Sequence, residues 1–205
     1  MPFLNSHAHL TFDVLPMIRK DDPFQALPSM ILKCLSANPV LRPLPVQMLH
    51  QLTCWSLLTH VSEENDDAAL ALLAEGGFDI NFQTEILQGQ FSALHLAAMM
   101  NRKRVARALI LSGAELNLQD KQGLTPLHRA VVKGHEGIVR LLIENEACVD
   151  IPNEHDLTPI FLALENGHSG CVQKLIEAKC NVNYRSLESG TPIYSAILGG
   201  NLECV

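Results

Sequence analysis

The sequence predicts an all-α fold in which helix–turn–helix units with finger turns stack into a solenoid, preceded by a short helical segment. A Thr-Pro pair recurs every 33 residues, at Thr125, Thr158 and Thr191, and a fixed period of this length is typical of stacked repeats. The composition is 47% hydrophobic but only 5% aromatic. The core must therefore be built from aliphatic side chains and alanine, which suits small helices packed closely together.

The repetition extends beyond the Thr-Pro pair. A weaker copy of the same start is Ser92-Ala93-Leu94-His95, in which serine replaces threonine. Small and aliphatic residues also recur at matched positions of the units: Ala97, Ala130, Ala163 and Ala196; Leu109, Leu142 and Leu175; Leu116, Val149 and Val182. Chance does not produce this many matches at one spacing, so each unit is predicted to fold in the same way.

Each unit is predicted to consist of a turn, an inner helix and an outer helix. One such turn is residues 120–123, whose glycine can take backbone angles that other residues resist. The Thr125 hydroxyl can satisfy free amides at the helix start, and proline costs no hydrogen bond at the first helical position. Gly134-His135 and Gly167-His168 are expected to end two inner helices, and the apolar spacing of residues 138–142 predicts an outer helix.

The motifs Thr-Pro-Leu-His-x-Ala, Gly-His and Gly-Ala-x-hydrophobic-Asn resemble those of the ankyrin-repeat family across roughly residues 55–205. The resemblance implies units at approximately 55–88, 89–119, 120–152 and 153–185, with an incomplete unit at 186–205. The outer-helix ending that begins at Gly113 fits the family well. Glu146 and Lys179 stand where that glycine would be, so we expect those two exits to be looser or more strained.

The first and last units are expected to be irregular. The first lacks Thr-Pro, has Ser56 where the threonine would stand, and is expected to form an outer helix over residues 69–73. Its finger loop around Gln88-Gly89 is three residues longer than the next one. The chain stops at Val205 as the fifth outer helix begins, so we expect further repeats to follow in a longer protein.

Residues 1–54 do not follow the repeat and hold seven of the eleven prolines. Helices are expected from Pro28 to before Asn38 and from Pro45 to about Trp55. Residues 28–52 resemble the last helices of a protein-kinase C-terminal lobe, where the arginine matched by Arg42 pairs with a glutamate. The motifs of a working kinase are missing from the sequence. No linker separates this segment from the repeats, so we expect rigid packing, with Trp55 filling the junction or anchoring a partner.

Charge and cysteine usage limit the partners and the compartment. The formal net charge of −7 argues against nucleic acid, which needs a cationic surface. The basic run Arg102, Lys103, Arg104 and Arg107 could attract an acidic peptide but is interpreted as a solvated helix face without a role. Six cysteines without a C-x-x-C pair indicate reduced thiols, and neither a leader nor an 18-residue apolar run occurs. We expect a cytoplasmic or nuclear protein without membrane insertion.

Catalytic and metal-binding patterns are weak. His7-Ala8-His9, with Asp13 nearby, resembles the His-x-His opening of metal-dependent amidohydrolases. Two ligands are not enough for such a site, and the histidines at 95, 128, 135 and 168 already have structural explanations as repeat positions. We therefore expect no catalytic residue, no metal and no cofactor in this chain.

The predicted partner surface is the concave face, where finger turns and the ends of inner helices vary from unit to unit. The finger residues are Lys121, Gln122, Leu124, Glu154, His155 and Leu157, and the inner-helix residues are Met99, Met100, Val132, Lys133, Glu165 and Asn166. An adaptable apolar strip between charges of both signs suits a protein or peptide partner. Met99 and Met100 could instead belong partly to the core.

Three asparagines form a further pattern. Asn81, Asn117 and Asn183 each follow a leucine by eight residues, which resembles ankyrin domains modified by an asparaginyl hydroxylase. The favoured alternative is that these side chains hold the finger turns by hydrogen bonds.

The sequence thus predicts a non-catalytic protein–protein interaction module that scaffolds or recruits a partner. The alternative is the C-terminal regulatory or substrate-recruiting part of an ankyrin-repeat kinase. Kinase motifs encoded upstream of Met1 would favour this alternative.

Overall fold

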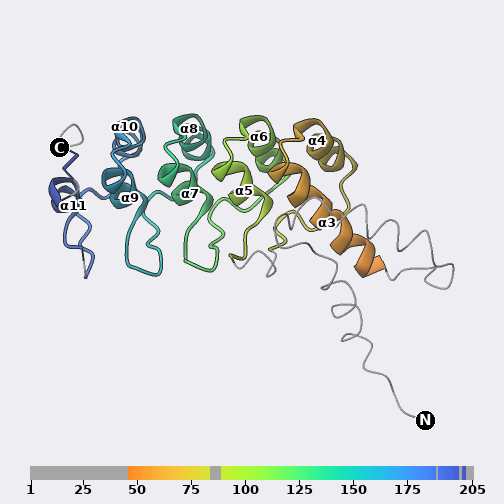
Figure 1. The fold of residues 1–205 in the computed structure, drawn as a ribbon, viewed down its shortest axis with the longest axis horizontal. Coiled ribbons are helices and arrows are strands. Elements are labelled where there is room, and N and C mark those ends of the chain that lie inside the picture. The colour runs from red at the N-terminus through yellow and green to blue at the C-terminus, as the bar shows by residue number, and fades with distance from the viewer. Residues whose placement is uncertain (1–45, 84–88, 188, 199, 202–205) are drawn as a thin grey trace, which may run out of the picture.

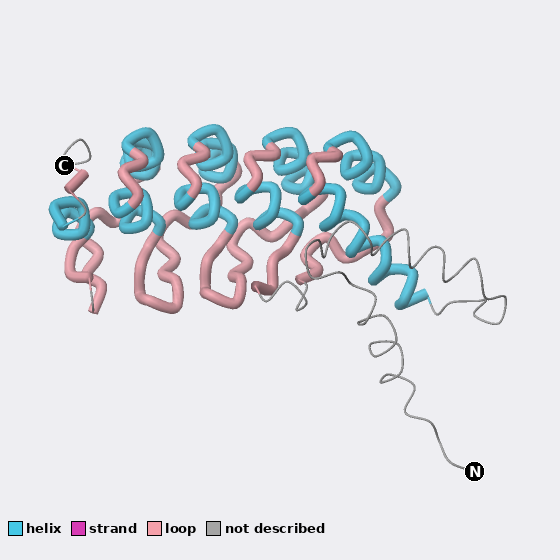
Figure 2. The backbone as a smooth tube through the Cα atoms, in the orientation of Figure 1, coloured by secondary structure: helices cyan, strands magenta, loops and turns pink. Residues whose placement is uncertain are grey.

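A computed structural model describes residues 46–83, 89–187, 189–198 and 200–201. Their helices form two rows (Figure 1). The inner row is α3 (Val46–Ser62), α5 (Ala93–Met99), α7 (Pro126–Val132), α9 (Pro159–Glu165) and α11 (Pro192–Leu198), and the outer row is α4 (Asp66–Glu75), α6 (Lys103–Leu111), α8 (Glu136–Glu144) and α10 (Ser169–Glu177). Finger loops project from the inner row, away from the outer row (Figure 2). The predicted all-α repeat solenoid is confirmed.

The core runs along the whole stack between the two rows. The matched alanines Ala97, Ala130, Ala163 and Ala196 are fully buried, so inner helices of successive units can approach closely. In α8, Ile138, Val139 and Leu142 are fully buried as the helical spacing predicts. In the first four units the inner and outer helices pack against each other, and matching helices of successive units are also in contact, which is why the core is continuous rather than divided among the units.

Two of the predicted inner-helix caps are complete. The Thr125 hydroxyl accepts a hydrogen bond from the His128 amide at 3.4 Å, and His128 Nδ1 accepts one from the Thr125 amide at 3.1 Å. Ser92 and His95 form the same reciprocal pair. These capping boxes satisfy amides that the first helical turn leaves free.

The predicted side-chain cap at Thr158 is wrong. Thr158 has the backbone conformation of a capping residue, but its buried hydroxyl has no hydrogen-bond partner among the described residues. The physical reason lies three residues later, where Phe161 replaces the histidine that completes the box in the two preceding units. The Phe161 ring instead packs edge-on against Tyr184, with ring centroids 6.3 Å apart.

The helix predicted to end at about Trp55 continues to Ser62. Ser56 therefore does not cap an inner helix; it lies inside α3, where its carbonyl accepts a hydrogen bond from the Thr59 hydroxyl at 2.8 Å. No glycine or proline interrupts residues 46–62, and buried Leu57, Leu58 and Val61 extend the helical spacing into the core. The first inner helix is thus continuous with residues before the repeats. Trp55 is half-buried and packs edge-on against Phe82 at 6.3 Å.

The exits of the outer helices carry the expected strain. Gly113 has φ +87°, and Glu146 and Lys179 have φ +68° and +59° at the matching positions. Left-handed backbone costs a residue with a side chain roughly 1–2 kcal/mol. The chain still turns in the same way, because the Ala147 amide donates to the Leu142 carbonyl at 3.0 Å just as the Ala114 amide donates to the Leu109 carbonyl.

Several predictions lie outside the described residues. These are the helix beginning at Pro28, the His7-Ala8-His9 motif, most of the kinase-like segment, the loop residues 84–88 and the chain end at 202–205.

Candidate interaction surface

The finger turns are built on a carboxylate or an amide side chain. Asp120 Oδ1 accepts hydrogen bonds from the amides of Gln122 at 2.8 Å and Leu124 at 3.0 Å. In the next finger, Asn153 Oδ1 accepts the equivalent bonds from the amides at positions 155 and 157, at 2.9 and 3.0 Å. Each tip is therefore held by its own first residue, as in an Asx turn.

Successive fingers are joined through their backbones. The Lys121 amide donates to the Gly89 carbonyl at 2.9 Å, and the Glu154 amide donates to the Gln122 carbonyl at 3.2 Å. The approach is close at Gly123, which has φ +70° and where a Cβ atom would lie 2.7 Å from the Glu154 nitrogen. Glycine is required there for both reasons.

Two glutamines that sequence reasoning missed bridge the fingers as well. Gln83 Nε2 donates to the carbonyls of Gln90 at 2.9 Å and Gln119 at 2.8 Å. Gln119 Nε2 repeats the arrangement with the carbonyls of Gly123 at 2.8 Å and Pro152 at 3.1 Å. The available signal was that each glutamine stands two residues after a matched asparagine, Asn81 or Asn117.

A partly buried ion pair supports the central finger and was also missed. Arg129 Nε donates to Asp120 Oδ2 at 2.7 Å, and the Arg129 side chain is only 15% exposed. The same guanidinium donates to Gln122 Oε1 at 2.8 Å and lies 4.9 Å from the centroid of the Phe91 ring. The signal was a charge at a helix position that leucine occupies in the neighbouring units, Leu96 and Leu162.

Most of the predicted surface residues are accessible. The exposed ones are Met100, Lys121, Gln122, Lys133, Glu154, His155, Glu165 and Asn166, and the half-buried ones are Met99, Val132 and Leu157. Leu124 is only 8% exposed, because it lies beneath the finger and its carbonyl faces His95 Nε2 at 3.0 Å. We therefore leave Leu124 out of the surface.

The ends of the inner helices are fixed by the following unit. His135 Nε2 donates to the Met99 carbonyl at 3.0 Å, and His168 Nε2 donates to the Val132 carbonyl at 3.2 Å. Asn201 Nδ2 takes the same role on the Glu165 carbonyl at 3.2 Å. Partial burial raises the pKa of the Glu165 carboxyl. The predicted structural role of the Gly-His histidines is confirmed.

The charges on this surface separate by unit. Lys121 and Lys133 come from one unit, and Glu154 and Glu165 come from matching or adjacent places in the next. Among the described residues, neither of the two lysines is in an ion pair. The surface thus presents two cationic side chains of one unit, Lys121 and Lys133, beside two anionic side chains of the next, Glu154 and Glu165. These pairs are called the cationic and anionic rows of the surface.

The family comparison assigns the architecture. Residues 57–153 match the family described as ankyrin repeats in three copies, and residues 155–187 match a further ankyrin repeat. Together the matches span more than half of the chain. The chain belongs to the ankyrin-repeat family. Such repeats mediate protein–protein interactions and are typically non-catalytic, so the coarse prediction of an interaction module is confirmed. Both matches begin after residue 56 and do not bear on the kinase-like segment.

One curated relative matches about a third of the chain. The human 2-5A-dependent ribonuclease is 39% identical over 70 residues, which are 34% of this chain and 9% of the relative. The chain thus covers less than a tenth of that protein, and the match supports the repeats rather than a ribonuclease activity.

Two of the asparagines hold neighbouring ankyrin repeats together. Asn81 Oδ1 accepts from the Glu115 amide and Asn117 Oδ1 accepts from the Cys148 amide, both at 2.8 Å. Asn183 is exposed, and its amide donates to Asn181 Oδ1 at 3.1 Å. Hydroxylation of these three residues stays a prediction.

Within the part of the chain that the structure describes, no three His, Cys, Asp or Glu side chains gather where they could hold a metal ion. None of the helices found there combines the length and the apolar character needed to cross a bilayer.

Proposed function

We propose that this chain recruits or scaffolds a protein or peptide partner along the face formed by its finger turns and inner-helix ends. The observation that carries the proposal is the set of hydrogen bonds that joins successive fingers. Backbone hydrogen bonds link Gly89 to Lys121 and Gln122 to Glu154. The side chains of Gln83 and Gln119 add further hydrogen bonds to the next finger. The tips remain exposed although their backbones are tied. A partner therefore meets a surface that is already ordered, which reduces the entropy lost on binding.

The side chains on this face favour a mixed interface. Met100 is 42% exposed, and half-buried Val132 lies beside exposed Lys133 at the end of the next inner helix. A flexible thioether next to charge suits an apolar anchor surrounded by polar contacts. The cationic and anionic rows favour a partner with acidic groups facing Lys121 and Lys133 and a basic group facing Glu154.

The kinase alternative gains no support from the described residues. The continuity of α3 would transmit the position of a preceding segment to the ankyrin repeats, but it does not say what that segment is. The ribonuclease activity of the human relative is likewise not proposed for this chain.

The test replaces Lys121, Val132 and Lys133 together with alanine in the full chain. Proteins captured by the wild-type and variant chains are compared by quantitative mass spectrometry, and the affinity for the best candidate is then measured with purified proteins. We expect the triple variant to weaken that affinity at least ~10-fold, since interface anchors commonly contribute more than 1 kcal/mol each.

A matched control replaces Gln173 and Lys174 of α10, on the outer row, with alanine. We expect this variant to bind the partner as the wild type does. If the finger variant and the wild type bound equally well, the proposed surface would be abandoned.

A further inference from the structure

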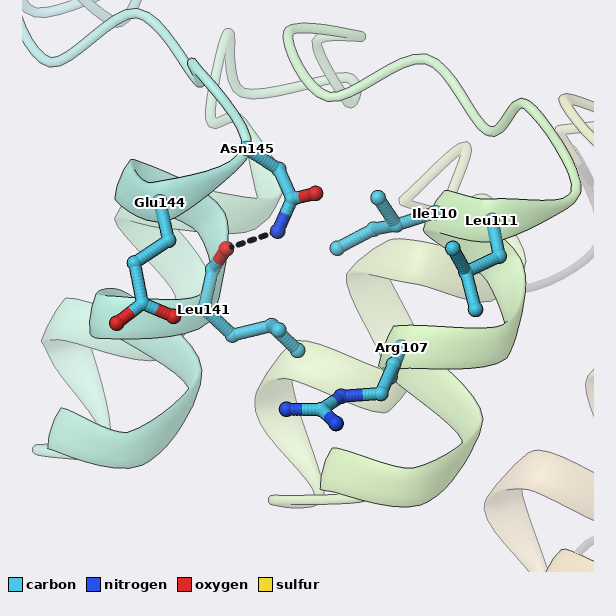
Figure 3. Close-up of a pocket in the computed structure, with 6 residues that line it drawn as sticks. All are labelled: Arg107, Ile110, Leu111, Leu141, Glu144 and Asn145. Atoms are coloured by element: carbon cyan, nitrogen blue, oxygen red, sulfur yellow. Dashed lines mark hydrogen bonds between the residues drawn. The ribbon is translucent and has the colours of Figure 1, made fainter.

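The outer row carries a furrow between α6 and α8 that the finger surface does not use. Its open end is a pocket of about 270 Å³ lined by Arg107, Ile110, Leu111, Leu141, Glu144 and Asn145. Figure 3 shows Leu141 of α8 pointing across the gap toward Arg107 and Ile110 of α6. The furrow lies on the outer row, which the inner helices separate from the fingers (Figure 2).

One end of this furrow is apolar and open. Leu111 lines the pocket and is 81% exposed. The half-buried Ile110 and buried Leu141 form the apolar walls, and Asn145 Nδ2 is engaged with the Leu141 carbonyl at 2.8 Å. The pocket therefore offers apolar surface to a side chain that is not part of this chain's own core.

Cationic side chains of α6 begin at the pocket and continue along the furrow. Lys103 and Arg107 lie four residues apart on α6, which places them on one face of the helix. Lys103 extends over Gly137 of α8, with its Nζ 3.8 Å from where a Cβ atom would stand on that glycine. Among the residues that the structure describes, neither cation takes part in an ion pair.

The neighbouring units do not share this pattern. The positions of Lys103, Arg107 and Leu111 are occupied in α8 by Glu136, Arg140 and Glu144. There Glu144 lies 3.6 Å from Arg140 and neutralises it. Arg107 lacks such a partner because Leu111 stands where the glutamate would be. The lack of an ion pair at Arg107 and the exposed apolar side chain at Leu111 therefore have the same cause, the leucine at position 111.

We propose that this furrow is a docking site for a short acidic peptide segment with a large apolar anchor. The anchor enters the pocket beside Leu111 while carboxylates of the same segment approach Arg107 and Lys103. Charge complementarity selects this occupant, since Lys103 and Arg107 take no part in the ion pairs of the described residues. Glu144 also lines the pocket, but its carboxylate lies 3.6 Å from Arg140, which reduces its repulsion of an acidic segment.

The experiment selects a displayed random peptide library against the full chain, with counter-selection against the full chain carrying Arg107→Ala and Leu111→Asp. Both replaced residues are exposed, so the variant keeps its core. We expect enriched peptides to carry Asp or Glu close to a Leu, Phe or Met. Their affinity for the wild type should fall at least ~10-fold with either substitution, and should weaken in 0.5 M salt because exposed charges are screened.

Matched controls on the finger edge are Lys121→Ala and Leu187→Asp, the latter at a leucine that is 94% exposed. Peptides that use the furrow bind these variants as tightly as the wild type, which separates this site from the proposed finger surface. The proposal is overturned if no peptide distinguishes wild type from the furrow variant, or if the distinguishing peptides lack carboxylates.

Discussion

His128 joins two ankyrin repeats through the carbonyl of Leu157, to which its Nε2 donates at 3.3 Å. The other ring nitrogen accepts from the Thr125 amide. An amide can only donate and a carbonyl can only accept, so the imidazole is neutral with its proton on Nε2. His95 is held in the same way between Ser92 and Leu124. These histidines cap their own helix and fasten the next repeat at once.

Acid should weaken the stack through these two imidazoles. Burial lowers the pKa of both His95 and His128 from 6.5 to about 4. The unfolded chain therefore binds more protons than the folded one as the pH falls below 6.5, and stability is lost progressively down to about pH 4. The loss is at most on the order of 3 kcal/mol per imidazole.

Urea unfolding at pH 7.5 and pH 5 measures this effect. In a His128→Gln variant, which cannot titrate at that site, we expect a smaller loss of stability between the two pH values. Equal losses in the variant and the wild type would contradict the assignment.

Thr125 and Thr158 form a matched pair with different expected costs. Thr125→Val removes a cap and should lower the free energy of unfolding by about 1 kcal/mol. Thr158→Val removes a buried hydroxyl that has no partner among the described residues, so we expect no loss or a small gain. Chemical denaturation of both variants gives the comparison, and equal destabilisation would refute the difference between the two caps.

The turn that follows α8 should be more stable with glycine than with glutamate at position 146. Glu146→Gly relieves a left-handed backbone of φ +68° and should stabilise the chain by about 0.5–1 kcal/mol. The matched change Gly113→Ala, at φ +87°, should destabilise it by about 1 kcal/mol. Thermal unfolding measures both shifts, and the same sign for the two variants would be inconsistent with the strain.

Asp120→Asn isolates the charge of the finger ion pair. An amide oxygen can still hold the turn, as Asn153 does in the next finger. The variant leaves the partly buried Arg129 without its counter-charge and should lower stability by about 3 kcal/mol. Denaturation measurements on Asp120→Asn and on the turn-matched Asn153→Asp separate the two roles. A loss below 0.5 kcal/mol in the first variant would show that the charge is unimportant.

The sequence predicted the parts of the fold that repeat. The Thr-Pro starts, the buried alanines and the Gly-His ends follow from local rules that apply identically to each unit. It predicted a helix from Pro45 but ended it at about Trp55, because Ser56 was matched to the threonine that caps the other inner helices, whereas α3 continues to Ser62. The burial of Leu57 and Val61 in the core stabilises these last two turns of the helix.

The candidate surface was less predictable than the fold. Exposed Lys121 and Lys133 followed from the variation between units, but Leu124 did not, because burial beneath a finger depends on the neighbouring finger. The Gln83 and Gln119 bridges and the furrow beside Leu111 arise where repeats meet. Such contacts join residues about one repeat apart, and a single unit's pattern does not encode them.

The most direct test of the binding account places a photo-crosslinking amino acid at position 133, on an inner-helix end, or at position 173, on the outer row. Each full-length variant is incubated with the partner captured by the wild-type chain and is then irradiated. The account predicts that position 133 crosslinks to the partner and position 173 does not. Crosslinking from position 173 alone would contradict it.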